Sequence, residues 1–585
     1  MRGRDSNDGS QTTDYFKVGG EPLGERTAKW INDDYVKFLR LGERLVERAG
    51  LGIVGYVTNH SWIDNPTFRG VRAGILGLFR HLEVLDLHGN STKKERAPDG
   101  GKDENVFDIK QGVAISLLSR PLPADLTRRV LWGELWGNRD QKYQALAKTR
   151  ASERQELYPQ PPNYLLVPQD VALKSEYGLG ISVVDMFPLK GHGVITKRDN
   201  LAVHFTADEA WSTVSAFATC PPLEAYRTFA LPEDVRDWSV QAAQRDLVST
   251  GPSRDLVRSL CYRPFNKRYT YYTGRARGFI GWPVDKVMRH MLAGPNIALI
   301  ATRQTKDQWG VFVAGTLIGH KACSAYDINT VFPLFLTDES VTGLFRDSTG
   351  RSVNLDPQSI APFDQVLGAR VLSEEGARRL GVVSGAQGLF GYLYAVFYSA
   401  QYRTRYAQFL NTEYPRVPIP KSEAAFRRLA GLGSELVALH LLEGRNADRS
   451  VCSYVGPRNA LVSAVEWVAD TVWIQLEGRG DRQRASPERP GFRGVSAEVW
   501  KFRVGGYQVC DKWLKDRKGR RLSNEDVAQF ESIVDAVAAS IRLMKEIDVV
   551  IGEQGGWSGT FNVGAAEMEV LPMAAETLAE YSPDA

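Results

Sequence analysis

The first 120 residues alternate between helix-like segments and short apolar runs, and this alternation restricts the fold more than any other feature. Residues 31–50 carry apolar side chains at helical spacing, with Asn32 as the expected N-cap and Gly50 as the expected end. The apolar runs at residues 51–59, 81–89 and 112–119 predict strands, the first of them buried. Helices that alternate with buried strands indicate an α/β layer.

Size and composition set wide limits. The 585 residues suffice for more than one domain, and a net charge of +4 is too small to indicate nucleic-acid binding by itself. The five cysteines lie far apart without metal-binding spacing, so we predict reduced thiols and no metal site. No apolar run reaches the roughly 20 residues of a membrane helix, and the N-terminus lacks a secretory signal. We therefore expect a cytoplasmic protein without membrane contact.

The tetrapeptide Asn65-Pro66-Thr67-Phe68 differs at one residue from Asn-Pro-Pro-Phe, a catalytic motif of amino-methylating DNA methyltransferases. That motif depends on two consecutive prolines, which fix a turn after a strand, while its aromatic ring stacks on the flipped base. Here Thr67 replaces the second proline. Asn65 and Pro66 instead suit the N-cap and first turn of a helix, so the sequence predicts a helix start.

Residues 258–277 contain six basic residues, five aromatic residues and no acidic residue. Basic side chains neutralise phosphates, arginine also reads guanine edges, and tyrosine stacks on bases. The candidate DNA contacts in this stretch are Arg258, Arg263, Lys267, Arg268, Tyr269, Arg275 and Arg277. The alternative is a packed hairpin in which Tyr269 and Tyr271 mark a buried strand face.

Two further basic segments are candidates for phosphate contact. Residues 512–521 have six positive residues and one aspartate, and Ser523 with Asp526 predicts a capping box at the start of the next helix. The candidates in these segments are Lys512, Lys515, Arg517 and Lys518, and the turn Thr196, Lys197 and Arg198. In both segments, solvated charges are the alternative.

Several long strings resemble type ISP restriction–modification enzymes, namely residues 17–43, 55–72, 85–115 and 506–523. These enzymes are bacterial single chains that join nuclease, translocase, adenine-specific DNA methyltransferase and target-recognition domains. The resemblance covers nearly the whole chain and matches the C-terminal part of those enzymes. It implies an α/β fold class, in which residues 1–124 form the C-terminal half of a Rossmann-like methyltransferase domain. A mixed α+β target-recognition domain would follow at 125–440, and 441–585 would complete the specificity region with C-terminal helices.

The resemblance also implies double-stranded DNA as partner and S-adenosylmethionine as the cofactor that methylates adenine N6. In the family, the glycine-rich cofactor motif and the Asn-Pro-Pro-Tyr motif lie upstream of the string at residues 17–43, and the sequence contains neither. We expect a truncated product, a misplaced start, or an upstream polypeptide that supplies the missing half. Asn105, Phe107 and Gln111 fall where the family holds the extruded base, with Phe107 placed to stack on adenine. The alternative for Phe107 is a core residue at a strand edge.

Two other functions compete with this one. The absent motifs favour a DNA-binding module without catalysis. Asp99, followed by Asp108 and Lys110, imitates a metal-dependent nuclease signature, which requires its carboxylates on adjacent strands. We expect the DNA-recognition and methyltransferase segment first and the non-catalytic module second.

Overall fold

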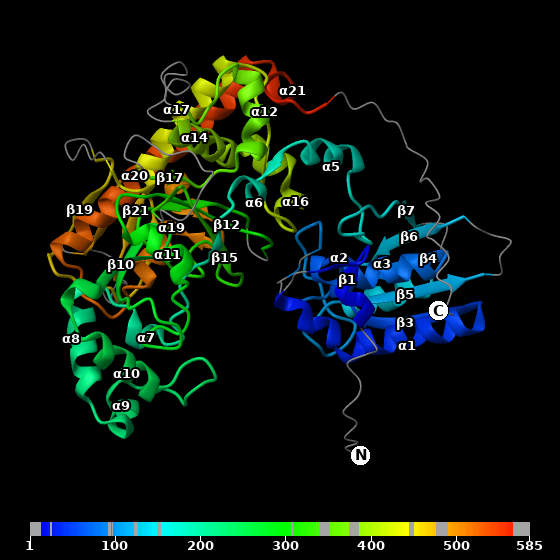
Figure 1. Cartoon of the computed structure of the whole chain (residues 1–585), viewed down its shortest axis with the longest axis horizontal. Coiled ribbons are helices and arrows are strands. Elements are labelled where there is room, and N and C mark those ends of the chain that lie inside the picture. The colour runs from blue at the N-terminus through cyan, green and yellow to red at the C-terminus, as the bar shows by residue number, and fades with distance from the viewer. Residues whose placement is uncertain are drawn as a thin grey trace, which may run out of the picture. The chain divides into compact units, whose positions relative to one another are not determined.

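The chain divides into two compact units, Met1–Asp170 (unit 1) and Val171–Ala585 (unit 2) (Figure 1). The computed structural model describes residues 13–23, 26–91, 95, 97–121, 127–148, 154–305, 308–337, 351–373, 385–443, 450–475 and 489–564. No helix in these ranges is both long and apolar enough to cross a membrane. The fold is of the mixed α/β class.

Unit 1 is organised around a five-stranded mixed sheet. Its strands are β3 (Gly52–Asn59), β4 (His81–Asp86), β5 (Val113–Arg120), β6 (Arg129–Glu134) and β7 (Gln155–Leu157). Their order is β3-β5-β4-β6-β7, and β5 is antiparallel to both of its neighbours. β3 and β4 therefore run in the same direction and end at the same edge of the sheet. The predicted strands in the first 120 residues are confirmed.

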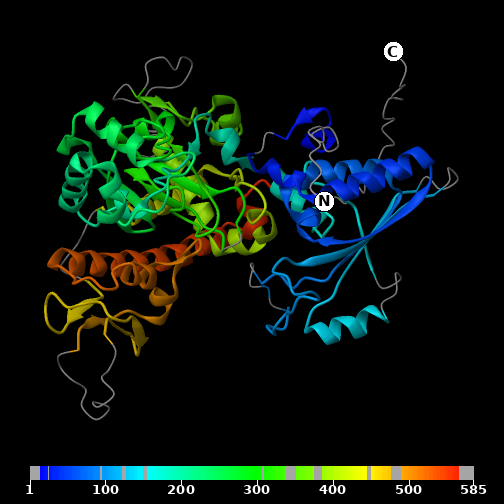
Figure 2. The same cartoon turned by 90° about the horizontal axis from the view of Figure 1, so that it is seen from below.

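Two helices cover one face of this sheet. The apolar sides of α1 (Asp34–Ala49) and α3 (Arg69–Leu78) join a core with Val84, Ala114 and Leu118 of the strands. Figure 2 shows α1, in blue, lying along the sheet. The helix ends at the left-handed Gly50 as predicted, but its N-cap is Asp33 rather than Asn32. Short segments complete this unit: β1 (Lys17–Val18), β2 (Glu21–Pro22), α2 (Ser61–Asp64) and α4 (Arg139–Leu146).

The other face of the sheet leaves apolar side chains exposed. Ile53 is 70% exposed, Val57 49% and Leu117 44%. The prediction of a buried strand at residues 51–59 is wrong, because β3 is an edge strand. Among the described residues, β3 has a hydrogen-bonded strand on one side only.

The sheet continues beyond residue 124, where the sequence suggested a new domain. β6 pairs in parallel with β4, and β7 pairs antiparallel with β6. The compact unit consequently extends to Asp170. Local patterns do not reveal this extension, because the pairing of β6 with β4 joins segments that are distant in the sequence.

The tetrapeptide at residues 65–68 starts a helix, as predicted. The Asn65 side chain accepts a hydrogen bond of 2.9 Å from the backbone N–H of Thr67, and Pro66 opens a short 3-10 helix (Pro66–Phe68) that leads into α3. Phe68 is only 2% exposed and contributes to the core of unit 1. Its ring is therefore not placed to stack on a base.

Unit 2 contains two four-stranded antiparallel sheets and a three-stranded mixed sheet among its helices. The sheet orders are β13-β12-β15-β9, β19-β22-β21-β20 and β11-β10-β14. The strands are β8 (Ile181–Ser182), β9 (Gly191–His192), β10 (Val257–Arg263), β11 (Asn266–Tyr271), β12 (Ala298–Thr302), β13 (Phe312–Ala314), β14 (Leu317–Ile318), β15 (Asn329–Pro333), β16 (Phe335–Leu336), β17 (Ser352–Val353), β18 (Arg416–Val417), β19 (Ser453–Val455), β20 (Glu466–Val468), β21 (Thr471–Trp473), β22 (Gly491–Arg493), β23 (Arg503–Val504) and β24 (Tyr507–Gln508). The helices are α5 (Val171–Gly178), α6 (Val183–Met186), α7 (Asp199–Ala202), α8 (Ala207–Thr219), α9 (Pro222–Thr228), α10 (Val240–Thr250), α11 (Asp285–Leu292), α12 (Pro357–Leu367), α14 (Gly385–Tyr398), α15 (Ala400–Arg405), α16 (Ala407–Leu410), α17 (Glu423–His440), α18 (Ala497–Lys501), α19 (Val509–Lys515), α20 (Asn524–Glu553) and α21 (Gly556–Thr560).

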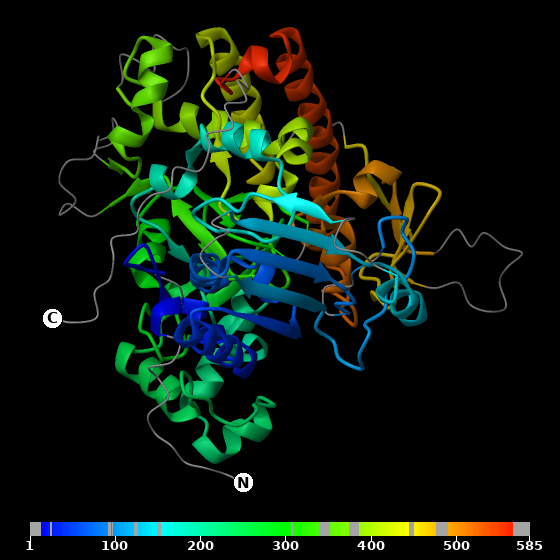
Figure 3. The same cartoon turned by 90° about the vertical axis from the view of Figure 1, so that its right-hand side faces the viewer.

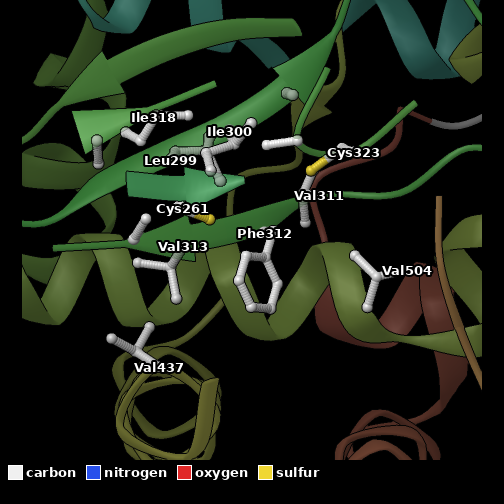
Figure 4. Close-up of a cluster of buried hydrophobic side chains, with 14 of the residues drawn as sticks. Cys261, Leu299, Ile300, Val311, Phe312, Val313, Ile318, Cys323, Val437 and Val504 are labelled. Atoms are coloured by element: carbon white, nitrogen blue, oxygen red, sulfur yellow. The ribbon is translucent and has the colours of Figure 1, made fainter. Parts of the chain in front are cut away.

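The core of unit 2 lies between its sheets and the helices α14, α17 and α20. Figure 4 shows Leu299 and Ile300 of β12 and Phe312 of β13 close to Cys261 and Cys323. Burial raises the pKa of both thiols, and all five cysteines of the chain are free. These two cysteines therefore act as small apolar side chains.

Helix α14 is buried on nearly all sides, and its tyrosines belong to the core as predicted. It packs against α17 most closely where Gly391 faces Gly433. A Cβ atom on Gly433 would lie 1.8 Å from the Gly391 carbonyl oxygen. Glycine at this crossing is required by the distance between the two backbones.

His440 joins three helices. The Tyr394 hydroxyl lies 2.6 Å from His440 Nδ1, and His440 Nε2 lies 3.0 Å from the Ser540 hydroxyl on α20, the long orange helix in Figure 3. Because Ser540 donates its own proton to the Ala536 carbonyl, it accepts from His440 Nε2. Burial, together with the charge of Arg403, lowers the pKa of His440 to about 3. The imidazole is therefore neutral, and it accepts a hydrogen bond from Tyr394 and donates one to Ser540.

Replacing Gly433 with alanine should force α14 and α17 apart. We expect the free energy of unfolding to fall by roughly 1–3 kcal/mol, as measured by urea denaturation. The matched control is Gly431→Ala in the same helix, where a Cβ meets nothing within 4 Å. That control should gain about 0.5–1 kcal/mol from helix propensity. Equal effects of the two substitutions would contradict the close crossing.

Acid should destabilise unit 2 through His440. The unfolded imidazole has a pKa of about 6.5, while in the folded chain the pKa is about 3. As the pH falls from about 6.5 towards 3, His440 becomes protonated in the unfolded state but stays neutral in the folded state. The free energy of unfolding therefore decreases. His440→Gln, which has no titrating group, should be less stable at neutral pH but less dependent on pH over this interval. Parallel pH profiles from urea denaturation would contradict this role.

Candidate nucleic-acid interface

The basic and aromatic stretch at residues 258–277 forms a hairpin and a following loop. β10 and β11 pair antiparallel, with Leu260 opposite Arg268. Arg258 and Lys267 are exposed, whereas Leu260 and Tyr271 are buried. Tyr269 is half-buried, and the Lys267 ammonium group lies 5.5 Å from the centre of its ring. The hairpin therefore combines a packed face, as the alternative interpretation predicted, with exposed cations that stay candidates for DNA contact.

Arg268 points into the protein. Its guanidinium carbon lies 3.4 Å from the ring centre of Phe205, and one of its nitrogens lies 3.8 Å from the Asp516 carboxylate. Burial, with the nearby charge of Arg517, lowers the pKa of Arg268 to about 9. The side chain does not reach the surface, so we assign it a structural role rather than a DNA contact.

Asp516 connects this hairpin to the second basic stretch. Its carboxylate accepts a hydrogen bond of 2.9 Å from Asn266 in β11 and one of 2.5 Å from Lys512 in α19. The two basic segments, at 258–277 and 512–521, are therefore in contact although they are far apart in the sequence.

Only part of the second stretch faces solvent. Arg517 is 3% exposed, lies 3.3 Å from the ring centre of Trp513 and donates a hydrogen bond of 2.9 Å to Asp526. Burial lowers the pKa of Arg517 to about 10. Lys515 and Lys518 are exposed. Arg517 therefore supports the fold, and these two lysines remain candidates for phosphate contact.

Phe205 lies at the centre of this junction. Besides Arg268, Arg520 lies 3.9 Å and Arg517 5.2 Å from the centre of its ring. Arg520 also pairs with Glu209 at 2.5 Å. A cation over the face of an aromatic ring is attracted by the negative charge density of that face. An open groove of about 780 Å³ begins here, lined among others by His204, Phe205 and Arg520.

The turn at residues 196–198 contributes one exposed cation. Thr196 is buried and hydrogen-bonds to the Asp199 carboxylate. Arg198 lies 4.7 Å from the ring centre of Trp238 and donates to a backbone carbonyl. Lys197 is exposed and has a left-handed backbone with φ +68°. Of the three residues, only Lys197 is an exposed cation, and it stays a candidate for phosphate contact.

Lys197 and Arg277 share one carboxylate. Their charged groups lie 3.9 Å and 3.7 Å from Asp237, so the pair retains a net positive charge. Arg277 also has a left-handed backbone, with φ +59°. Such conformations cost roughly 1–3 kcal/mol in non-glycine residues and are concentrated at functional sites. Trp282, 36% exposed, lies beside Arg277 at 5.9 Å.

The remaining candidates of the first stretch lie nearby. Arg275 is exposed, with Nη1 3.9 Å from the Asp246 carboxylate. Arg263 is half-buried and lies 4.1 Å from the ring centre of Tyr262. We retain Arg275 as a candidate phosphate contact, whereas the ring contact accounts for much of the Arg263 side chain.

The base-pocket candidates of unit 1 lie in the loop between β4 and β5. The Asn105 side chain donates to the carbonyls of Gly89 and Gln111 and accepts from the backbone of Phe107, so it holds this loop together. Phe107 is 47% exposed and Gln111 is exposed. Phe107 is therefore not a core residue, and its ring is accessible.

The nuclease-like residues do not form a metal-binding pair. Asp99 accepts a hydrogen bond from the backbone of Gly101, and Asp108 pairs with Arg139 at 2.7 Å. Both carboxylates lie in loops rather than on adjacent strands. The arrangement that such a nuclease requires is absent from these described residues.

A polar cluster that the sequence reasoning missed lies where β3 and β4 end. His60 Nδ1 is 3.0 Å from the Asp86 carboxylate, and His88 Nε2 is 2.9 Å from the Glu134 carboxylate. Burial alone would raise the pKa of Asp86, but the hydrogen bond from His60 and the two neighbouring imidazoles outweigh it and lower that pKa. Polar residues directly after two predicted strands were the available signal.

The described residues of unit 1 do not by themselves fit S-adenosylmethionine. Such a nucleoside cofactor requires a glycine-rich turn between a strand and a helix. β3 leads through His60 into the four-residue helix α2, and the described residues of the loop after β4 form no helix. β6 leads into α4 through residues 135–138, which contain one glycine, Gly137. None of these connections is a glycine-rich turn.

Comparison with known proteins places the chain in a family. The Type ISP C-terminal specificity domain matches residues 185–546, which is more than half of the chain. The chain therefore belongs to this family, as its sequence strings predicted. No curated protein sequence matches it.

Three solved structures are similar in fold. A nuclease-deletion mutant of the Type ISP restriction–modification enzyme LlaGI, in complex with a DNA substrate mimic, matches with 17% identity and a TM-score of 0.59, covering 89% of this chain and 41% of that chain. The ATP-dependent Type ISP enzyme LlaBIII bound to DNA matches with 19% identity and a TM-score of 0.61, covering 90% and 35%. A cryo-EM structure of a DrdV–DNA complex matches with 18% identity and a TM-score of 0.62, covering 89% and 52%. The chain thus spans about half or less of these proteins.

Removing the carboxylate of Asp516 should loosen the junction between the two basic segments. Asp516→Ala leaves Asn266, Arg268 and Lys512 without their shared partner, and we expect the free energy of unfolding to fall by roughly 1–3 kcal/mol. The control Asp511→Ala breaks a more exposed pair with Lys515 on the same helix and should cost about 1 kcal/mol or less. A smaller loss for Asp516→Ala than for the control, in thermal or urea unfolding, would contradict the role of Asp516.

Proposed function

We propose that this chain recognises double-stranded DNA through unit 2, as the specificity segment of a bacterial restriction–modification enzyme. The observation that carries the proposal is the meeting of two basic segments around Phe205, close to exposed cations. Family membership and the DNA complexes of proteins with this fold support it.

The buried and exposed cations have different tasks in this proposal. Arg268 and Arg517 fix the hairpin and α19 against each other. The residues that meet phosphates are the exposed ones, namely Lys197, Arg258, Lys267, Arg275, Arg277, Lys515 and Lys518. Trp282 adds an accessible aromatic ring beside Arg277. Phosphate contacts set the register, and base contacts in the groove select the target sequence.

For unit 1 we propose the C-terminal half of a Rossmann-like DNA methyltransferase domain. Parallel β3 and β4, with the antiparallel β5 between them, end at one edge, as ligand-binding strands do in α/β sheets. The accessible ring of Phe107 would stack on an extruded adenine, because a base outside the duplex needs a new stacking surface. The reaction of the intact enzyme is methyl transfer from S-adenosylmethionine to adenine N6.

The cofactor site of this proposal comes from a second polypeptide segment. The side of β3 that has no partner strand among the described residues supports this, since an edge strand offers backbone N–H and C=O groups to a further strand. Without that segment the chain is a DNA-binding module that lacks catalysis, which is the second candidate function.

DNA binding should depend on Lys197 and Arg277. We expect the double substitution to alanine to weaken binding of a mixed-sequence duplex and to reduce the slope of log K against log salt by about 0.9 for each lost phosphate contact. Fluorescence anisotropy between 50 and about 200 mM salt measures both effects. The matched control Lys545→Ala removes an exposed lysine of α20, which pairs with Glu498 of α18, and should leave the slope unchanged. An unchanged slope in the double variant would exclude these two residues from the interface.

Transfer of labelled methyl groups from S-adenosylmethionine to unmethylated DNA separates the two candidate functions. Label with the chain together with the product of an adjacent upstream reading frame supports a split methyltransferase. DNA binding without label in either sample supports the non-catalytic module. Label with the chain alone would contradict the proposal of a second segment.

A further inference from the structure

The cluster at the ends of β3 and β4 takes no part in the proposed DNA recognition by unit 2. His60 directly follows β3, and His88 follows β4 by two residues. One ligand atom from each of His60, His88 and Glu95 lies within 4.8 Å of the others. His60 and His88 are 3% and 9% exposed, so the cluster is largely shielded from solvent. Three metal-binding side chains from separate parts of the sequence are thus brought together.

The ring of His60 is held in one orientation. Its Nδ1 lies 3.0 Å from Asp86, and a Cβ on Gly112 would lie 2.4 Å from the ring carbon Cε1, so the backbone packs directly against the imidazole. Because Nδ1–H donates to the carboxylate, Nε2 carries the lone pair, and it accepts a hydrogen bond of 3.2 Å from the Asn90 side-chain amide. A metal ion at Nε2 would take the place of this amide donor. A carboxylate behind a histidine in this manner is the usual support of a metal ligand.

The ring of His88 is also held in one orientation. Its ring stacks on Trp136 with 3.4 Å between centres, and its backbone is left-handed, with φ +50°. Its Nε2 lies 2.9 Å from the Glu134 carboxylate, and its Nδ1 lies 3.6 Å from the Asp86 carboxylate. A residue held in a sparsely populated backbone conformation is overdetermined by its surroundings, which is frequent at functional sites.

The charge of the cluster favours a cation. In the part of the chain that the structure describes, the ion pairs of Asp86 and Glu134 are with histidines only. Among the described residues, neutral imidazoles would leave these carboxylates, and Glu95 beside them, without a compensating charge. Of the three, Asp86 is buried, at 5% exposed, whereas Glu95 and Glu134 are partly exposed. A buried carboxylate without compensation is costly, and a divalent ion would offset its charge.

We propose that His60, His88 and Glu95 bind one divalent transition-metal ion, for which zinc is the best match, with Asp86 as the group that orients His60. Two imidazoles and one carboxylate form a zinc ligand set that leaves a fourth position open. The absence of a metal pattern in the sequence is explained by the spacing, because the ligands come from two strand ends and a loop rather than from one short motif.

The ion would hold the loop that carries Phe107. Gly89, next to His88, accepts a hydrogen bond from the Asn105 side chain at 3.1 Å, and a Cβ on Gly89 would lie 2.4 Å from Asn105 Cα. The segment after β4 therefore packs directly on the base-pocket loop. Metal binding at this place requires neither DNA nor S-adenosylmethionine, so the inference stands apart from the proposed function.

Zinc titration of the untagged full-length chain tests the site. After chelator treatment and desalting, Zn²⁺ is added in competition with a chromophoric zinc indicator. We expect one tightly bound zinc per chain. His60→Ala and His88→Ala should each weaken binding at least 100-fold, and Asp86→Asn about 10–100-fold. The matched control His81→Ala, at the opposite end of β4, should bind as the unsubstituted chain does.

X-ray absorption at the zinc edge of the loaded, unsubstituted chain provides a test that does not depend on folding of the variants. Nitrogen and oxygen ligands, including imidazole, are expected, whereas sulfur ligands would assign the zinc to cysteines and overturn the proposal. Zinc uptake by the unsubstituted chain that is no tighter than that of a correctly folded His60→Ala or His88→Ala chain, checked by circular dichroism, would also overturn it. The cluster would then be a network of hydrogen bonds only.

Discussion

Two buried guanidinium groups in unit 2 must be stabilised without water, and the architecture around the proposed DNA interface follows from this requirement. Arg268 lies against Phe205 and near Asp516, and Arg517 lies against Trp513 and is hydrogen-bonded to Asp526. A charge that loses its hydration is tolerated only with close partners. Phe205 lies directly before α8, Trp513 and Asp516 lie in and directly after α19, and Asp526 lies at the start of α20. Because Arg268 belongs to β11, the contacts of the two arginines hold these elements against one another.

This arrangement separates cations that support the fold from cations that remain exposed. Lys267 lies on β11 and Lys515 on α19, the two elements that Asp516 links. Lys197 and Arg277 both lie close to the Asp237 carboxylate. This single negative charge offsets only one of their two positive charges.

Unit 1 follows a different principle. Its sheet is covered by α1 and α3 on one face, whereas Ile53, Val57 and Leu117 are exposed on the other, and β3 has a free edge among the described residues. Parallel α/β sheets normally have both faces covered. The titratable side chains His60, Asp86 and His88 lie together at the ends of β3 and β4, where loops from different parts of the sequence meet.

Local sequence determined several elements and helix ends: helix α1 with Gly50 at its end, the strands β3, β4 and β5, the helix start at Asn65, and the capping box at Ser523. These features depend on backbone propensities and hydrogen bonds within a few residues. Tertiary structure alone decided that β6 and β7 extend the first sheet, that Arg268 and Arg517 turn inward while Lys267 and Lys518 face solvent, and that His60 meets His88. Each of these outcomes depends on contacts between segments distant in the chain, and a charged residue has the same local pattern whether its partner is water or a buried carboxylate.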